Sequence, residues 1–176
     1  MRINSVKRRI SLLEATSKLK GPLRELRRGR FVVAIEFFVP YRCFDVTLRN
    51  GRDSDTFLLA VDSVCGRLDP WRIDQLTLSE ERSAVDTGYV ADDRLSEMHA
   101  LGVVEELTKR ATYLKGFFKV RDINIRARYL ETLYMPYWVA IYERNNNARL
   151  DAINGLTGMH EGAKFREIVA DWFQPQ

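Results

Sequence analysis

The sequence predicts an α+β fold of two repeated helix–strand–bent strand–strand units with antiparallel sheets, followed by a C-terminal helix. Aromatic and β-branched strand segments, amphipathic helix segments and an internal match carry this prediction. Residues 37–66 read FFVPYRCFDVTLRNGRDSDTFLLAVDSVCG, and residues 133–158 read LYMPYWVAIYERNNNARLDAINGLTG. With 45% apolar and 30% charged residues among 176, the composition is that of a soluble globular chain, and we expect no membrane span.

The internal match rests on a Pro-Tyr pair and on a strand end that finishes in glycine. These motif residues are Pro40, Tyr41, Asp62 and Gly66 in the first copy and Pro136, Tyr137, Asn154 and Gly158 in the second. The second copy is shorter by about four residues, and the difference falls in the polar turn, where a hairpin tolerates a change of length. We interpret the match as a duplication; the alternative is convergence of two similar hairpins.

The first copy begins with a segment whose apolar residues have helical spacing, namely Ile3, Val6, Ile10 and Leu13. Gly21-Pro22 predicts a break in this helix, with Pro22 opening a second turn. Residues 31–38 are almost wholly apolar and predict a strand buried on both faces or a short crossover. The strands predicted at 39–48 and 135–142 contain Pro40 and Pro136 near their starts, and we expect the sheet to bend or to change partner at these prolines. Asn50-Gly51 is a strong turn signal.

The second copy is predicted to repeat this plan. Asp92 or Asp93 caps a helix that runs to residue 114, and residues 121–129 alternate polar and apolar as a strand with one wet face. Residues 161–173 form a closing amphipathic helix, and a capping box at residues 77–80 predicts a short helix in the link. We therefore expect one compact body, with a first repeat at 1–68, a connecting segment at 69–91 and a second repeat with the C-terminal helix at 92–176.

The net charge of +4 is unevenly distributed along the chain. Residues 1–30 hold ten Lys/Arg and two acidic residues, whereas the other residues carry a net charge of −4. A basic arm beside a mildly acidic body is typical of attraction to phosphates, an anionic membrane surface or an acidic partner, or of an arm packed on its own body. The candidate nucleic-acid-binding or anion-binding residues are Lys7, Arg8, Arg9, Arg27, Arg28, Arg30, Arg126 and Arg128.

The second hairpin resembles the closing strands of PepSY-type domains. Tyr134, Pro136, Tyr137 and Trp138 form an aromatic-Pro-aromatic strand, and the next strand ends in Asn154-Gly155-Leu156-Thr157-Gly158. The resemblance covers about 35 residues of each copy, and the first copy has Cys65 in place of the threonine. It implies the topology of an α+β repeat and a non-catalytic binding or inhibitory module.

Motifs for catalysis and cofactors are missing from the sequence. There is no phosphate-binding glycine loop and no nucleophile elbow, and two cysteines without a CxxC spacing do not predict a metal site. We expect Cys43 and Cys65 to be buried apolar residues, and we predict no cofactor. His160 and His99 are the only candidate bases, and Asp62 is explained by a hydrogen-bonded turn.

The leading prediction is a non-catalytic binding or assembly module that uses the basic N-terminal segment and a sheet face. Its partner would be an unknown protein or an acidic surface, and an exposed strand edge is compatible with a homodimer. The alternatives are a nucleic-acid-binding protein, and a small hydrolase or transferase with a cleft between the repeats. The N-terminus lacks the apolar segment of a secretory signal, so a cytoplasmic location is expected.

Overall fold

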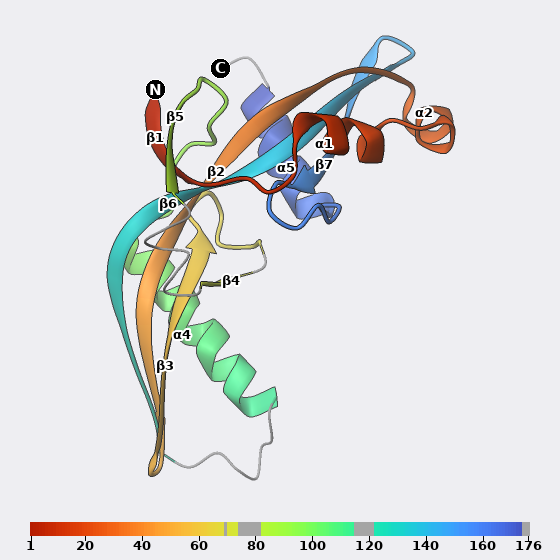
Figure 1. The fold of residues 1–176 in the computed structure, drawn as a ribbon. Helices are drawn as coiled ribbons and strands as arrows, with labels where there is room; N and C mark the ends of the chain where they lie inside the picture. Colours follow the sequence, from red (N-terminus) through yellow and green to blue (C-terminus); the bar gives the residue numbers. More distant parts are fainter. Residues whose placement is uncertain (69, 74–81, 115–121, 174–176) are drawn as a thin grey trace. The chain divides into compact units, whose positions relative to one another are not determined.

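The chain forms an α+β structure, as predicted, with helices that pack on one sheet (Figure 1). The computed structural model describes residues 1–68, 70–73, 82–114 and 122–173. Its helices are α1 (Leu12–Leu19), α2 (Pro22–Arg28), α4 (Glu97–Leu114) and α5 (Ala163–Phe173). Its strands are β1 (Arg2–Val6), β2 (Arg30–Asn50), β3 (Asp53–Asp62), β4 (Trp71–Ile73), β5 (Arg82–Asp86), β6 (Ile123–Arg144) and β7 (Asn147–Asn154). The strand order is β4-β3-β2-β6-β1-β5, and β7 pairs with β6.

The elements divide into two units, and each unit takes segments from both halves of the chain. Unit 1 consists of Met1–Val39, Ser83–Asp92 and Tyr134–Gln176, and unit 2 of Pro40–Arg82 and Asp93–Leu133. The long strands β2 and β6 belong to both units, and each passes from one to the other close to its proline. No described helix is long and apolar enough to cross a membrane.

The two prolines mark the points where the long strands gain a new partner, as predicted. Strand β2 pairs with β3 from Tyr41 opposite Asp62, and β6 pairs with β7 from Tyr137 opposite Asn154. Proline has no N–H for a ladder bond, but its carbonyl still accepts. The Pro40 carbonyl accepts from the Ser63 N–H at 2.9 Å, and the Pro136 carbonyl accepts from the Gly155 N–H at 2.8 Å.

Both hairpins close at the predicted polar turns. In the first, Gly51 has a φ of +65°, and in the second, Asn145 and Asn146 have φ values of 52° and 59°. Two successive residues with positive φ define the tight turns that match the twist of paired strands, and asparagine tolerates this conformation best after glycine.

The core of unit 2 lies between α4 and the sheet. Helix α4 packs on β3, and its buried Ala100 and Val104 contact a cluster of side chains from β2, β3 and β6. The β6 side chains of this cluster are Ile125, Ala127 and Tyr129, with exposed residues between them, which confirms the predicted alternation. Two faces of different polarity therefore fix this register.

The core of unit 1 lies between α1 and the second hairpin. Ala15 and Leu19 of α1 pack against Trp138, Tyr142 and other buried residues of β6 and β7. The Tyr142 hydroxyl donates to the Leu19 carbonyl at the end of α1. Helix α5 also packs on β7 and buries Phe165, Ile168 and Val169, three residues of the predicted amphipathic stripe.

Two helix predictions are corrected by the structure. Residues 2–6 form strand β1, which pairs in parallel with β6 at Ser5 opposite Tyr134, so Ile3 and Val6 are buried in a strand. Helix α4 begins at Glu97, after Ser96, whose hydroxyl accepts from the His99 N–H at 3.3 Å. In both cases a backbone contact with a distant segment decides the local structure, namely that of Ser5 with Tyr134 and that of Arg94 and Leu95 with Ser63.

The prediction for residues 31–38 is partly wrong. Phe37 and Phe38 are buried, but Val32 and Val33 are exposed. The helix predicted at residues 77–80 lies outside the described residues.

Candidate anion-binding surface

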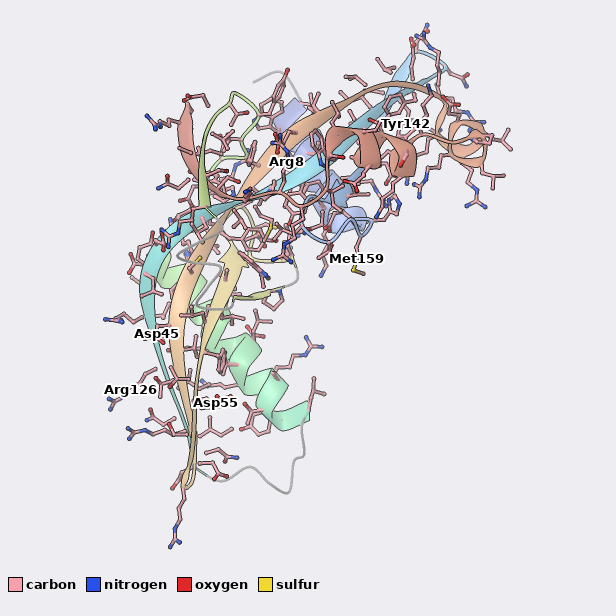
Figure 2. All side chains as sticks on the ribbon, in the orientation of Figure 1. Arg8, Asp45, Asp55, Arg126, Tyr142 and Met159 are labelled. Carbon is pink, nitrogen blue, oxygen red and sulfur yellow. The ribbon has the colours of Figure 1, made fainter. Side chains whose placement is uncertain are left out.

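The predicted basic residues belong to both units. Lys7, Arg8, Arg9, Arg27, Arg28 and Arg30 lie in unit 1, whereas Arg126 and Arg128 lie in unit 2 on the exposed face of β6. Figure 2 labels one residue of each group, Arg8 and Arg126. Arg128 approaches Asp45 of the neighbouring strand at 3.4 Å. The structure therefore does not assign the eight residues to one unit.

Contacts with other side chains of unit 1 already engage the Arg8 guanidinium. Its guanidinium makes two contacts of 2.8 Å with the Glu36 carboxylate and lies 5.7 Å from the centre of the Trp138 ring. An arginine held between a carboxylate and an indole has fewer donors left for a ligand. We therefore place the candidate surface at α2, which carries Arg27 and Arg28.

Helix α2 is short and buries none of its residues. Pro22 occupies its first turn, as predicted, and leucine, arginine and glutamate are good helix formers. The helix ends at Gly29, whose φ is +108°, and a Cβ there would lie 2.2 Å from the Glu143 carbonyl oxygen of β6. Only glycine allows this close approach between the end of α2 and the second hairpin.

One buried carboxylate holds the inner side of α2. Asp151 of β7, with 3% of its side chain exposed, contacts Arg24 at 2.8 Å and Arg28 at 3.1 Å. Residues four apart lie on one side of a helix, so both arginines reach the same acid. A buried carboxylate with two partners keeps its charge satisfied, and this contact fixes the orientation of α2.

The tip of the second hairpin holds the C-terminal end of α2. Arg144 donates to the carbonyls of Leu26 and Arg27 at 3.2 and 2.9 Å, and Arg149 donates to the Arg27 carbonyl at 3.1 Å. The last carbonyls of a helix have no intrahelical partner and carry partial negative charge, so cations bind them favourably. Polar contacts therefore hold α2 against the second hairpin within unit 1.

The outer side of α2 combines leucine and arginine. Leu23 and Leu26 are 75% and 74% exposed, and Arg27 is exposed beside them. These residues are three and four positions apart and share one side of the helix, opposite Arg24 and Arg28. We call Leu23, Leu26 and Arg27 the outer face of α2.

The two histidines occupy polar positions in different units. His160 Nε2 lies 2.7 Å from Arg24, and because arginine can only donate, this nitrogen accepts and the ring is neutral. Burial, followed by the Arg24 charge, lowers the pKa of His160. His99 is exposed, and its ring bonds to Ser96 at the start of α4. A nitrogen occupied by a cation is a poor general base.

Two side chains of the repeated motif, the acid Asp62 and the amide Asn154, hold turns, as the sequence predicts for Asp62. The Asp62 side chain is buried and accepts from the N–H groups of Cys65, Gly66 and Leu68 at 2.8–3.0 Å. Asn154 Oδ1 accepts in the same way from the N–H groups of two residues that follow it, at 2.9 and 3.2 Å. Gly66 and Gly158 end the two turns with φ values of +66° and +67°.

A second pair of contacts was missed by our sequence analysis. The N–H groups of Arg94 and Leu95 donate to the Ser63 carbonyl at 2.9 and 2.6 Å. The N–H groups of Arg9 and Ile10 donate to the Gly155 carbonyl at 3.0 and 2.9 Å. Each pair lies just before the serine that precedes α1 or α4, and the signal in the sequence is Arg9-Ile10-Ser11 against Arg94-Leu95-Ser96.

The cysteines lie in unlike environments. Cys43 is buried, as expected, and burial raises its pKa to about 12, whereas Cys65 is only partly buried. No cluster of metal-ligating side chains occurs among the described residues. Comparisons with protein families, curated proteins and solved structures find no match to this chain.

Proposed function

We propose that the chain is a non-catalytic binding module that presents the outer face of α2 to an acidic partner. The observation that carries this proposal is that α2 contributes nothing to the core. Ordering a seven-residue helix costs conformational entropy, and burial of apolar area usually offsets that cost. Here a buried acid and two arginines hold the helix, and its leucines are left in water. The surface therefore has a use outside the fold.

Charge supports an acidic partner for this face. Arg27 lies on α2, Lys20 and Arg30 lie just before and just after it in the chain, and Arg144 and Arg149 bind carbonyls at its C-terminal end. Three acids near α2 are engaged: Glu143 contacts Arg30, the Glu25 carboxylate accepts from the Phe31 N–H, and Asp151 contacts Arg24 and Arg28. A cluster of this sign raises the local concentration and the association rate of an anionic partner.

We also propose that the scaffold is an internal duplication. Support comes from the two hairpins, which share the contact to the proline carbonyl, the acceptor side chain and the glycine with positive φ. The contact that precedes each helix recurs as well. The PepSY-type resemblance stays a prediction that rests on the residues of the second hairpin.

The binding proposal is tested by retention on immobilised heparin, a polyanion, in a salt gradient. We expect Lys20→Glu/Arg27→Glu to elute at much lower salt than the unmodified chain, because exposed charges act through a screened potential. The matched control is Lys109→Glu/Arg110→Glu, which makes the same change of net charge on α4. Equal effects of both variants, or no retention of the unmodified chain, would contradict the proposal.

Nucleic acid is the alternative occupant. Repeating the gradient with a single-stranded oligonucleotide of matched charge distinguishes it, since specific recognition adds retention beyond that on heparin. Loss of that extra retention in Arg126→Gln/Arg128→Gln would favour the nucleic-acid function over the proposed one.

A further inference from the structure

The outer face of α2 combines exposed leucines with a basic residue, and this combination favours one kind of acidic partner. Two leucines, each about three-quarters exposed, lie beside Arg27 on one side of the helix. Helix α1 adds two more exposed leucines, Leu12 and Leu13. Single exposed leucines are ordinary on protein surfaces, but Leu23 and Leu26 share one side of α2 with Arg27, and exposed leucines that adjoin a basic side chain mark an interaction site.

From this combination we infer that unit 1 binds the surface of an anionic phospholipid bilayer through the outer face of α2. The inference rests on the proposed function and names its partner. A helix that lies in a membrane interface inserts leucines among the acyl chains, and its lysines and arginines remain at the headgroups. The inner side of α2 is held by Asp151, so the helix can present its outer face without unfolding.

Other acidic partners fit this face less well. Single-stranded nucleic acid is bound by aromatic side chains that stack on bases, and the outer face of α2 holds leucines instead. Phe31, which follows α2, is partly buried, and its ring lies under Lys20 at 5.9 Å. A bilayer is the partner that offers negative charge and an apolar interior side by side.

The docking of α2 also agrees with a membrane-facing role. The side chains of Arg24, Arg28, Arg144 and Arg149 form the contacts between α2 and the second hairpin, whereas Arg27 contributes only its backbone carbonyl to those contacts. The guanidinium of Arg27 therefore remains available to a headgroup phosphate, which arginine binds in a bidentate manner.

The test is co-sedimentation of the full chain with two kinds of vesicle, phosphatidylcholine alone and phosphatidylcholine with phosphatidylserine. We expect binding only to the mixed vesicles, and binding that falls as salt rises. Leu23→Ser/Leu26→Ser should weaken the partition by about tenfold per leucine, because each loses burial of an apolar side chain. Arg27→Gln should weaken it about fivefold.

The matched control is Leu114→Ser, which removes a leucine of similar exposure, 79%, from α4 in unit 2. It should leave the partition unchanged. Helix content measured by circular dichroism should be preserved in every variant, because none of these side chains is buried.

Three results would overturn the inference. The first is binding to mixed vesicles that is insensitive to Leu23→Ser/Leu26→Ser, which would reduce the contact to charge alone. The second is an equal effect of Leu114→Ser. The third is no vesicle binding with heparin retention intact, which removes the lipid partner but leaves the proposed function standing. Loss of both vesicle binding and heparin retention would refute the proposed function as well.

Discussion

The turn after β3 allows a quantitative test, because one buried carboxylate holds three backbone N–H groups. Asp62 accepts from Cys65, Gly66 and Leu68 at 2.8–3.0 Å. A hydrogen bond to a charged group contributes about 1.5–3 kcal/mol, and water can replace part of it where the amides are only partly buried. We therefore expect Asp62→Ala to lower the free energy of unfolding by about 3 kcal/mol.

The second hairpin supplies the matched comparison. Asn154 Oδ1 accepts two N–H groups, at 2.9 and 3.2 Å, and the side chain carries no charge. Neutral hydrogen bonds contribute about 0.5–1.5 kcal/mol each, so Asn154→Ala should cost about 1–2 kcal/mol. Asp62→Asn should fall between the two alanine variants, because it keeps two acceptor contacts and turns an amide donor toward the Leu68 N–H.

Urea unfolding followed by circular dichroism measures all three variants, with the slope of the transition checking that each exposes the same surface. We expect Asp62→Ala to lower the free energy of unfolding the most. Asp62→Asn should cost less than Asp62→Ala and at least as much as Asn154→Ala. If Asp62→Ala costs less than about 1 kcal/mol, the carboxylate does not hold this turn and our account of the motif acid fails.

Three further predictions concern other features. Gly29→Ala should lower the melting temperature, since its Cβ would lie 2.2 Å from a backbone oxygen, whereas Gly102→Ala in α4 has nothing within 4 Å and should raise it; the reverse order would contradict the structure. The pKa of His160 is lowered on folding, so the unfolded chain binds more protons and stability should fall as the pH drops below about 6.5. His160→Gln should remove that part of the pH dependence, and an unchanged profile would refute it. A protease site placed within residues 74–81 should give two fragments that co-elute after cleavage, because each unit contains segments of both; separation without denaturant would count against the two units.

Local chemistry explains the features that could be predicted from the sequence. The Pro-Tyr segments, the Asn-Gly turn and the acceptor side chains at 62 and 154 each act over a few residues, and the structure bears them out. The alternation of polar and apolar residues over 123–129 could also be predicted, because a strand with one face in water has a strict period of two.

Predictions failed where a distant segment decides the local structure. Ile3 and Val6 fit a helical stripe, but strand β1 pairs with Tyr134 in the second half of the chain. The start of α4 was placed at Asp92 or Asp93, yet the backbone of Arg94 and Leu95 is bonded to Ser63. Asp93 contacts Arg42 at 3.0 Å instead of capping the helix. Periodicity and capping signals carry no information about such partners.

The outer face of α2 could be predicted only in part. The basic composition of residues 1–30 was visible, and so was the helix break at Pro22. The sequence does not show which side of α2 faces the solvent, because leucines such as Leu23 and Leu26 are ordinarily assigned to the core. Asp151 reverses that choice, since it draws Arg24 and Arg28 inward. An acid 127 residues away from Arg24 thus decides which side of α2 meets the solvent.

The largest feature that periodicity misses is which hairpin each helix covers. An amphipathic helix shows that one side is buried, but it does not identify the surface that buries it. Helix α1 shares unit 1 with the first part of β2, which then passes into unit 2 and forms its hairpin there with β3. Helix α4 shares unit 2 with the first part of β6, which then passes into unit 1 and forms its hairpin there with β7. As a result, α1 packs on β7 and α4 packs on β3. Because each long strand leaves the unit of its own helix, each half of the chain completes a core that the other half begins, and neither α1 nor α4 lies in the same half as the hairpin that covers it.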